Sequence, residues 1–373
     1  RSRGLGDVYK RQPMKYTLEI QKRLLQVENG NLSPREKSSL LREAIRIADE
    51  NDDVQWAVEM RLDLIYELNQ LSEDQEEITV FSRILDDYEN NKDLIQEDDI
   101  LWKYKWIWGC AFDLPEIPKV QVDAIAEDFK TRILRNGYSA RSYYHLLSVQ
   151  NTRMRQYDKA KEYADKMQNE KLDDMMCEAC ELNFLLDIYL ETGKFDEAYH
   201  RAQPLISRQV TCYEANLRAF LKLSYYAQKA GKAEIAADMC ARAEEALAGR
   251  EKDEYLLPYL GNFITYYFMT NPQRGWEYVE CCVPWSLRTS KYKKYRFGCD
   301  MAEALKYESR PEVKLGLPEE FPLYNAEGTY QVAELRDYFY KQAEGLAHQY
   351  DTRNGNNGYM ERILCQCGNM PIQ

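Results

Sequence analysis

The chain has few histidines and none of the short motifs that mark the common enzyme active sites. Only three of its 373 residues are histidine, which limits the choice of a general base. It has no phosphate-binding glycine loop, no HExxH sequence and no GxSxG sequence. Paired acids such as Asp52-Asp53 and Asp86-Asp87 fall at expected helix ends or turns, where carboxylates act as caps. We therefore expect a protein that is not an enzyme and that uses no cofactor.

Long hydrophobic segments and excess positive charge are also missing. No apolar run approaches the roughly 18–20 residues that a bilayer requires. The segment after Met14 carries charges where a secretory signal would be apolar. The formal net charge of −12 argues against a nucleic-acid partner, because phosphates attract a basic surface. We expect a cytoplasmic protein without membrane contact, and we interpret the basic stretch at 288–296 as a solvated helix face.

The first residues differ in character from the rest. Residues 7–12 read DVYKRQ, which is the translation of a transposon end used in preparing sequencing libraries. We interpret residues 1–13 as a non-native leader and Met14 as the start of the native chain. A native basic arm is the alternative, since such arms occur at N-termini.

The most regular feature of the chain is a repeated phrase. Ala160, Ala198 and Ala236 are spaced 38 residues apart, and each closes a phrase of the same kind: RQYDKA, GKFDEA and GKAEIA. A fixed period in this range is typical of stacked helical repeats. Apolar residues at helical spacing over 182–190 precede the second phrase, and Gly193 then provides a helix stop.

These units resemble tetratricopeptide repeats (TPR). The best match comes from the residues that define the second unit: Tyr189, Gly193, Phe195, Asp196 and Ala198. The standard repeat has about 34 residues, so a spacing of 38 indicates longer helices or turns. Arg155 stands where the first unit should have its turn glycine, and Pro204 lies inside an expected helix. The resemblance covers residues 138–282 and implies an all-α fold, a right-handed superhelical solenoid of antiparallel helix hairpins.

Helical periodicity continues on both sides of these repeats. Ser33-Pro34-Arg35-Glu36 carries the signals of a helix start, and residues 101–109 form an aromatic helix. We expect degenerate hairpins over 14–137, the TPR-like array over 138–283, and a C-terminal part over 284–373. This last part should contain helices, a proline-containing connector at 309–328 and a closing helix at about 332–350 followed by a tail.

The resemblance implies a function as well as a fold. In TPR proteins the first helix of each hairpin lines a concave groove, which by position would here contain His145, Asn183, Asp187, Lys222, Tyr225 and Asn262. We expect a non-catalytic scaffold or adaptor that binds a protein or peptide there, as an extended segment or a helix. One alternative is a regulator that sequesters a response partner, as in bacterial peptide-sensing TPR proteins. A more remote one is an enzyme with its site in the C-terminal region near Asp351, a segment that otherwise reads as a helix C-cap.

The ten cysteines are expected to be small core residues, since no secretory signal accompanies them. Cys177 and Cys180 open the first helix of the best repeat, and Cys212 opens the corresponding helix of the next. Because stacked repeats place these helix starts close together, the three thiolates are candidate zinc ligands. No fourth ligand is evident and the CxxC sequence lacks a second half, so we expect no metal and keep zinc as the alternative.

Overall fold

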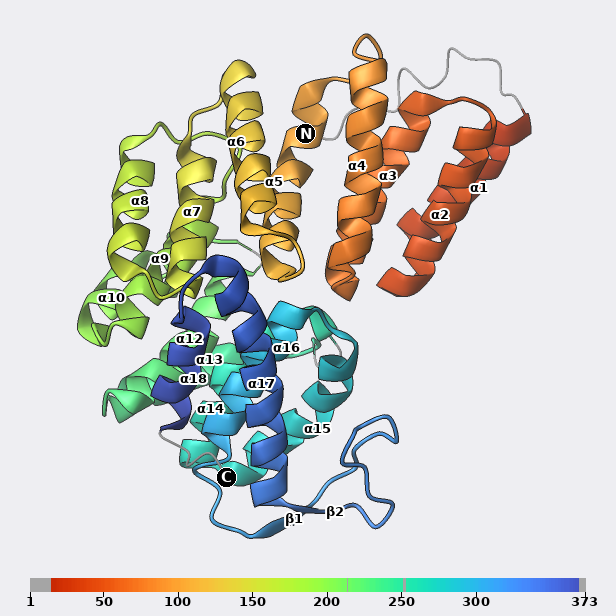
Figure 1. The fold of residues 1–373 in the computed structure, drawn as a ribbon. Coiled ribbons are helices and arrows are strands. Elements are labelled where there is room, and N and C mark those ends of the chain that lie inside the picture. The colour runs from red at the N-terminus through yellow and green to blue at the C-terminus, as the bar shows by residue number, and fades with distance from the viewer. Residues whose placement is uncertain (1–14, 213, 251–252, 369–373) are drawn as a thin grey trace. The chain divides into compact units, whose positions relative to one another are not determined.

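The computed structural model describes residues 15–212, 214–250 and 253–368. This part of the chain is almost entirely helical, with 18 α-helices and one pair of three-residue strands. Consecutive helices pack against each other, as α2 does with α3, α7 with α8, and α12 with α13 (Figure 1). The expected all-α class is confirmed. None of the described helices combines the length and apolar character needed to cross a bilayer. The expected leader at 1–13 lies outside the described residues.

The chain divides into two compact units, and the boundary between them, at Cys110 and Ala111, falls within α5. The helices of unit 1 are α1 (Lys15–Asn29), α2 (Pro34–Glu50), α3 (Val54–Leu71), α4 (Asp74–Asn90) and most of α5 (Glu97–Asp113). Helix α2 begins as predicted, because Ser33 and Glu36 cap each other's backbone N–H groups. Apolar side chains of α1, α2 and α3 share one core, which includes Ile20, Leu41 and Leu64.

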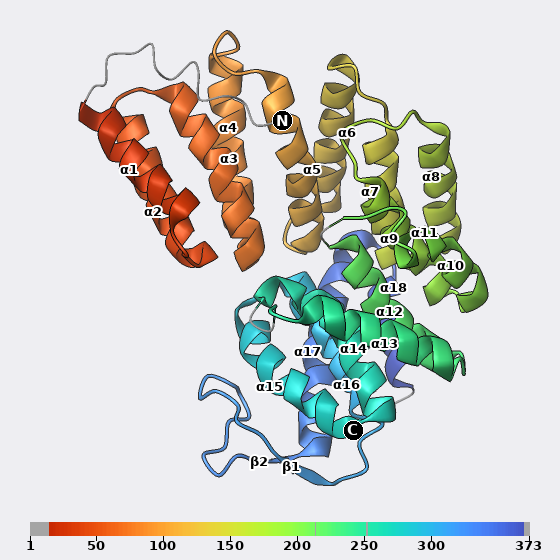
Figure 2. The same cartoon turned by 180° about the vertical axis from the view of Figure 1, so that it is seen from behind.

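Unit 2 continues the same pattern of packed helices (Figure 2). Its first helices are α6 (Lys119–Arg135), α7 (Arg141–Arg153), α8 (Tyr157–Asn169), α9 (Glu178–Glu191), α10 (Phe195–Arg201), α11 (Gln203–Ile206), α12 (Ala215–Lys229) and α13 (Ala233–Leu247). The remainder are the short 3₁₀ helix η2 (Glu254–Leu256), α14 (Leu257–Thr270), α15 (Pro272–Arg288), α16 (Lys291–Ala304), α17 (Val332–Asn354) and α18 (Gly358–Cys367).

The 38-residue period is visible in the backbone as well as in the sequence. The repeated alanines are fully buried where the second helix of each hairpin packs on the first. The turn between those helices needs a left-handed residue, and Gly193 and Gly231 supply it with φ of 75° and 73°. Arg155 takes the equivalent place in the first unit with φ of 57°, a conformation that disfavours an L-residue with a side chain. The three turns therefore have one geometry although only two contain glycine.

Pro204 interrupts the second helix of its hairpin. That helix is divided into α10 and α11, and Pro204 lies in the first turn of α11. Proline is tolerated there because the N–H group it lacks would have no partner within the helix.

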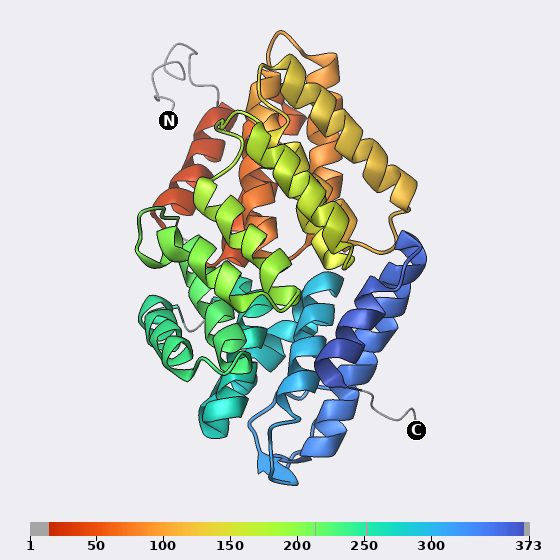
Figure 3. The ribbon, with the colours of Figure 1, turned by 90° about the vertical axis from the view of Figure 1, so that its left-hand side faces the viewer.

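The C-terminal region differs from the expected connector and tail. Strand β1 (Glu312–Lys314) lies within the connector and pairs with β2 (Thr329–Gln331), which follows it, as an antiparallel two-stranded sheet next to the start of α17 (Figure 3). Helix α17 ends at a left-handed C-cap, Gly355, which confirms the C-cap interpretation. The expectation of a tail after it is wrong, because α18 follows. Asp351 stabilises that helix by accepting the backbone N–H groups of Tyr359 and Met360.

Candidate functional site

The six residues expected to line a groove lie on the first helices of successive hairpins: α7, α9, α12 and α14. His145, Asn183 and Tyr225 are only 2%, 1% and 1% exposed, and the remaining three (Asp187, Lys222 and Asn262) are half-buried. Three of the six side chains are therefore covered by neighbouring parts of the protein. The side chains of Lys222, Tyr225 and Asn262 make hydrogen bonds with neighbouring helices of the same unit.

Two of these contacts join neighbouring first helices. The Lys222 ammonium group of α12 donates to the backbone carbonyl of Asn183 at 3.0 Å and to the carboxylate of Asp187 at 2.5 Å, both on α9. On α14, the Asn262 amide donates to the carboxylate of Asp300 in α16 at 3.4 Å. The side chains of Lys222, Asp187 and Asn262 therefore bond the protein itself, whereas the buried side-chain oxygen of Asn183 has no hydrogen-bond partner among the described residues.

Tyr225 makes the most extensive of these internal contacts. Its hydroxyl donates to both carboxylate oxygens of Glu303 in α16, at 2.8 and 2.9 Å. Lys229 and Gln366 also donate to Glu303, at 3.0 and 3.1 Å. A partner that used Tyr225 would have to replace this buried carboxylate. The use of the six residues as a binding groove stays a prediction.

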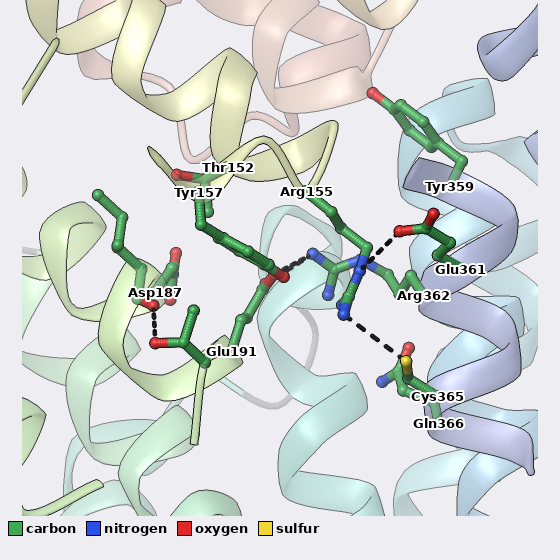
Figure 4. A network of polar contacts seen from close by, with 12 residues as sticks. Thr152, Arg155, Tyr157, Asp187, Glu191, Tyr359, Glu361, Arg362, Cys365 and Gln366 are labelled. Atoms are coloured by element: carbon green, nitrogen blue, oxygen red, sulfur yellow. Dashed lines mark hydrogen bonds and ion pairs between the residues drawn. The ribbon is translucent and has the colours of Figure 1, made fainter. Parts of the chain in front are cut away.

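Helix α18 is bound to the repeat helices by a second polar network (Figure 4). The guanidinium of Arg362 donates to Glu191 at the end of α9, at 2.6 Å, and the Tyr157 hydroxyl donates to the same carboxylate at 2.8 Å. Arg155 approaches Glu361 to 3.8 Å and donates to the Cys365 sulfur at 3.6 Å. Burial alone would raise the pKa of Glu191, but Arg362 and other cations hold that pKa below its usual value.

The C-terminal region named in the enzyme alternative contains a shallow hollow of about 360 Å³. His348, Asp351 and Asn356 are among the residues that line it. The carboxylate of Asp351 already accepts two backbone N–H groups at the start of α18, at 3.0 and 2.9 Å. This arrangement is that of a helix cap in the turn between α17 and α18.

The structure brings together the three cysteines singled out in the sequence. Cys177 is the N-cap of α9, Cys180 lies in its first turn, and Cys212 precedes α12. Their sulfur atoms all lie within 4.8 Å of one another, and those of Cys180 and Cys212 are 3.7 Å apart. All three side chains are half-buried. Burial and the neighbouring thiols raise the pKa of Cys180, whereas the pKa of Cys212 is lowered despite burial, by backbone N–H groups at the start of α12.

Sequence reasoning did not identify a group of aromatic side chains on the surface of unit 1. We call it the aromatic face and define it as Tyr66 of α3 with Trp102, Lys103 and Trp106 of α5. The Trp102 ring contacts the buried Lys105, whose ammonium nitrogen lies 3.0 Å from the ring centroid. Tyr66 and Trp102 are 48% and 38% exposed. The rings of Tyr66 and Trp106 have centroids 6.3 Å apart, and the Lys103 ammonium nitrogen lies 5.2 and 4.0 Å from those centroids. The 101–109 pattern indicated an aromatic helix, but not which of its rings face solvent.

Two ionisable groups at the aromatic face, Lys103 and the neighbouring Asp63, have shifted pKa values. Burial lowers the pKa of Lys103 to about 8, even though Asp63 and other carboxylates favour its charged form. Desolvation also raises the pKa of Asp63, whose side chain is nevertheless exposed.

A comparison with models of protein families finds no match for the chain, and a comparison with curated proteins finds none either.

Proposed function

We propose that the protein is a non-catalytic interaction scaffold, built as a right-handed TPR-like solenoid, that binds a protein or peptide partner on the aromatic face of unit 1. The observation that supports this most is the exposure of Tyr66 and Trp102 on adjacent helices. Tryptophan and tyrosine are the residues most enriched among those that dominate binding energy at protein interfaces. They bury a large area at a small cost in side-chain entropy.

The position of the aromatic face fits the resemblance to TPR proteins. In chain order α3 and α5 are separated by one helix, as successive groove-lining first helices are in that family. On the first helices of the unit 2 hairpins, groove residues such as Tyr225 already contact other parts of the protein: the Tyr225 hydroxyl donates to Glu303. The proposal therefore assigns partner binding to α3 and α5.

The charges beside the rings indicate the kind of partner. Lys103 and Asp63 lie on neighbouring helices and interact with each other, and each is partly desolvated. A peptide or helix with an apolar anchor and charged groups on both sides of it would pack on the rings and pair with these side chains. The partner we propose is such an amphipathic segment.

The test uses the full chain as bait in a cell lysate, with mass spectrometry to identify what is retained. The double variant Tyr66→Ala/Trp102→Ala removes the two most exposed rings of the aromatic face. We expect it to retain at least about tenfold less of the wild-type partner, since one hot-spot residue is worth 2 kcal/mol or more. Helicity by circular dichroism should not change, because both rings are exposed.

Tyr324→Ala is the matched control, because Tyr324 is a similarly exposed ring in unit 2. It should capture the partner as well as the wild type does. Equal capture by the double variant and this control would refute binding at the aromatic face.

A further inference from the structure

We propose that Cys177, Cys180 and Cys212 form a zinc site with three thiolate ligands and one open coordination position. This inference rests on the distances between the three sulfur atoms. Zinc is held by thiolates at about 2.3 Å in a tetrahedral arrangement, which places neighbouring sulfurs about 3.8 Å apart. The sulfurs of Cys180 and Cys212 are 3.7 Å apart, and all three lie within 4.8 Å of one another. An ion can therefore enter with only small side-chain movements.

The backbone holds the three cysteines in place from two helices. Cys177 and Cys180 are joined by the first turn of α9, and α9 packs against α12. The segment carrying Cys212 is fixed by Asn216, whose side-chain oxygen accepts the backbone N–H of Cys212 at 3.0 Å. The amide nitrogen of Asn216 in turn donates to the carbonyl of Leu205 at 2.8 Å. The sulfurs are thus positioned by hydrogen-bonded backbone, as a metal site requires.

The electrostatic surroundings favour a group with a net negative charge. Three thiolates and one Zn²⁺ have a total charge of −1, and binding releases the three thiol protons to solvent. The sulfurs lie at the N-terminal ends of α9 and α12, where the helix dipoles favour negative charge. The buried guanidinium of Arg218 also interacts electrostatically with Cys180.

The number and exposure of the ligands indicate an open site. Among the described residues, these three are the only side chains of ligand type that converge at this point. The fourth position would be filled by water or by a group from another molecule. Because all three cysteines are half-buried rather than enclosed, an ion has a route in. The other converging group, Asp74, Glu77 and Cys110, is buried and mixes two carboxylates with one thiol, which suits zinc less well.

The experiment measures metal uptake by the full chain, kept reduced and freed of metal with a chelator. Zn²⁺ is added, excess is removed, and bound zinc is counted by mass spectrometry. Co²⁺ serves as the spectroscopic probe, because tetrahedral thiolate coordination gives intense absorption bands. We expect one ion per chain and a thiolate-to-cobalt charge-transfer band.

Cys180→Ser should weaken zinc binding by at least about tenfold, since even residues that only support metal ligands are worth 10–100-fold in affinity. Cys281→Ser is the control, because Cys281 is an exposed thiol on α15 outside the group, and it should bind zinc like the wild type. Absence of uptake by the wild type, or unchanged uptake by Cys180→Ser, would overturn the proposal.

A second readout uses the wild type alone and so does not depend on how the variants fold. Iodoacetamide alkylates accessible thiols, and peptide mapping identifies the sites. We expect Zn²⁺ to slow labelling of Cys177, Cys180 and Cys212 and to leave that of the exposed Cys281 and Cys365 unchanged. Equal labelling of the three cysteines with and without zinc would also refute the site.

Discussion

Arg362 of α18 and Glu191 of α9 form a buried ion pair across 171 residues of sequence, with a nitrogen–oxygen distance of 2.6 Å. Glu191 is the last residue of the helix that precedes the best repeat phrase. The C-terminal helix α18 is therefore bound directly to the end of repeat helix α9. Both side chains of this pair are largely buried, unlike Glu361 in the contact of α18 with Arg155.

Arg362→Ala should destabilise the protein by about 3–5 kcal/mol, because it removes the cation that is hydrogen-bonded to the buried carboxylate of Glu191. Urea denaturation measures the change in the free energy of unfolding. Lys161→Ala removes one partner of an ion pair with Asp165 in which both side chains are largely exposed, and its effect should be below about 1 kcal/mol. Similar losses in the two variants would contradict a structural role for the buried pair.

The same carboxylate predicts a dependence of stability on pH. The pKa of Glu191 is lowered in the folded protein, so its ionised form stabilises the fold. This contribution is complete above the unfolded-state pKa of about 4.3 and is lost as the pH falls through the lower folded-state pKa. Below a pH of about 4.3, the free energy of unfolding of Glu191→Gln should therefore fall less steeply with falling pH than that of the wild type. Parallel curves of unfolding free energy against pH for the two proteins would show that Glu191 makes no such contribution.

Gly358, at the start of α18, tests how closely that helix approaches the repeats. A Cβ atom there would lie 2.0 Å from the backbone carbonyl oxygen of Met154, which cannot move aside as a side chain would. Gly358→Ala should therefore destabilise the protein by about 1–3 kcal/mol. The control is Gly345→Ala in the exposed part of α17, where a Cβ has open space, and it should stabilise by about 0.5–1 kcal/mol. The two changes in stability should have opposite signs, whereas helix propensity alone would make alanine stabilising at both positions.

Arg155 allows the left-handed turn to be separated from the side-chain contacts. Both Arg155→Gly and Arg155→Ala remove the approach to Glu361, but only glycine is unstrained at a φ of 57°. The glycine variant should be more stable than the alanine variant by about 1–2 kcal/mol. Thermal unfolding of the two variants, compared with each other rather than with the wild type, gives this difference. Equal stability would show that the turn carries no strain.

Local features of this fold could be predicted from the sequence. The capping box at Ser33, the glycine stop at Gly193 and the convergence of Cys180 with Cys212 all follow from patterns within one or two neighbouring repeats. Such signals depend on the geometry of a single helix or turn. They therefore do not depend on the contacts made by distant parts of the chain.

Features set by distant contacts could not be predicted in this way. Nothing near Tyr225 in the sequence shows that Glu303 will accept its hydroxyl hydrogen, and so the sequence predicts that Tyr225 faces a partner. The turn before Gly358 reads as the end of a helix, and only the contacts of Arg362 and Asp351 explain why another helix follows. The exposure of Trp102 likewise depends on which sides of α5 its neighbours cover.

The central claim is that a partner binds on the aromatic face of α3 and α5. Amide hydrogen exchange of the full chain, alone and with its captured partner, tests this most directly because it locates the protected backbone. We predict slower exchange in α3 and α5, and none of that protection in the Tyr66→Ala/Trp102→Ala variant. Protection confined to α9 and α12 with α3 and α5 unchanged would contradict the claim and would favour a groove in the repeat array instead.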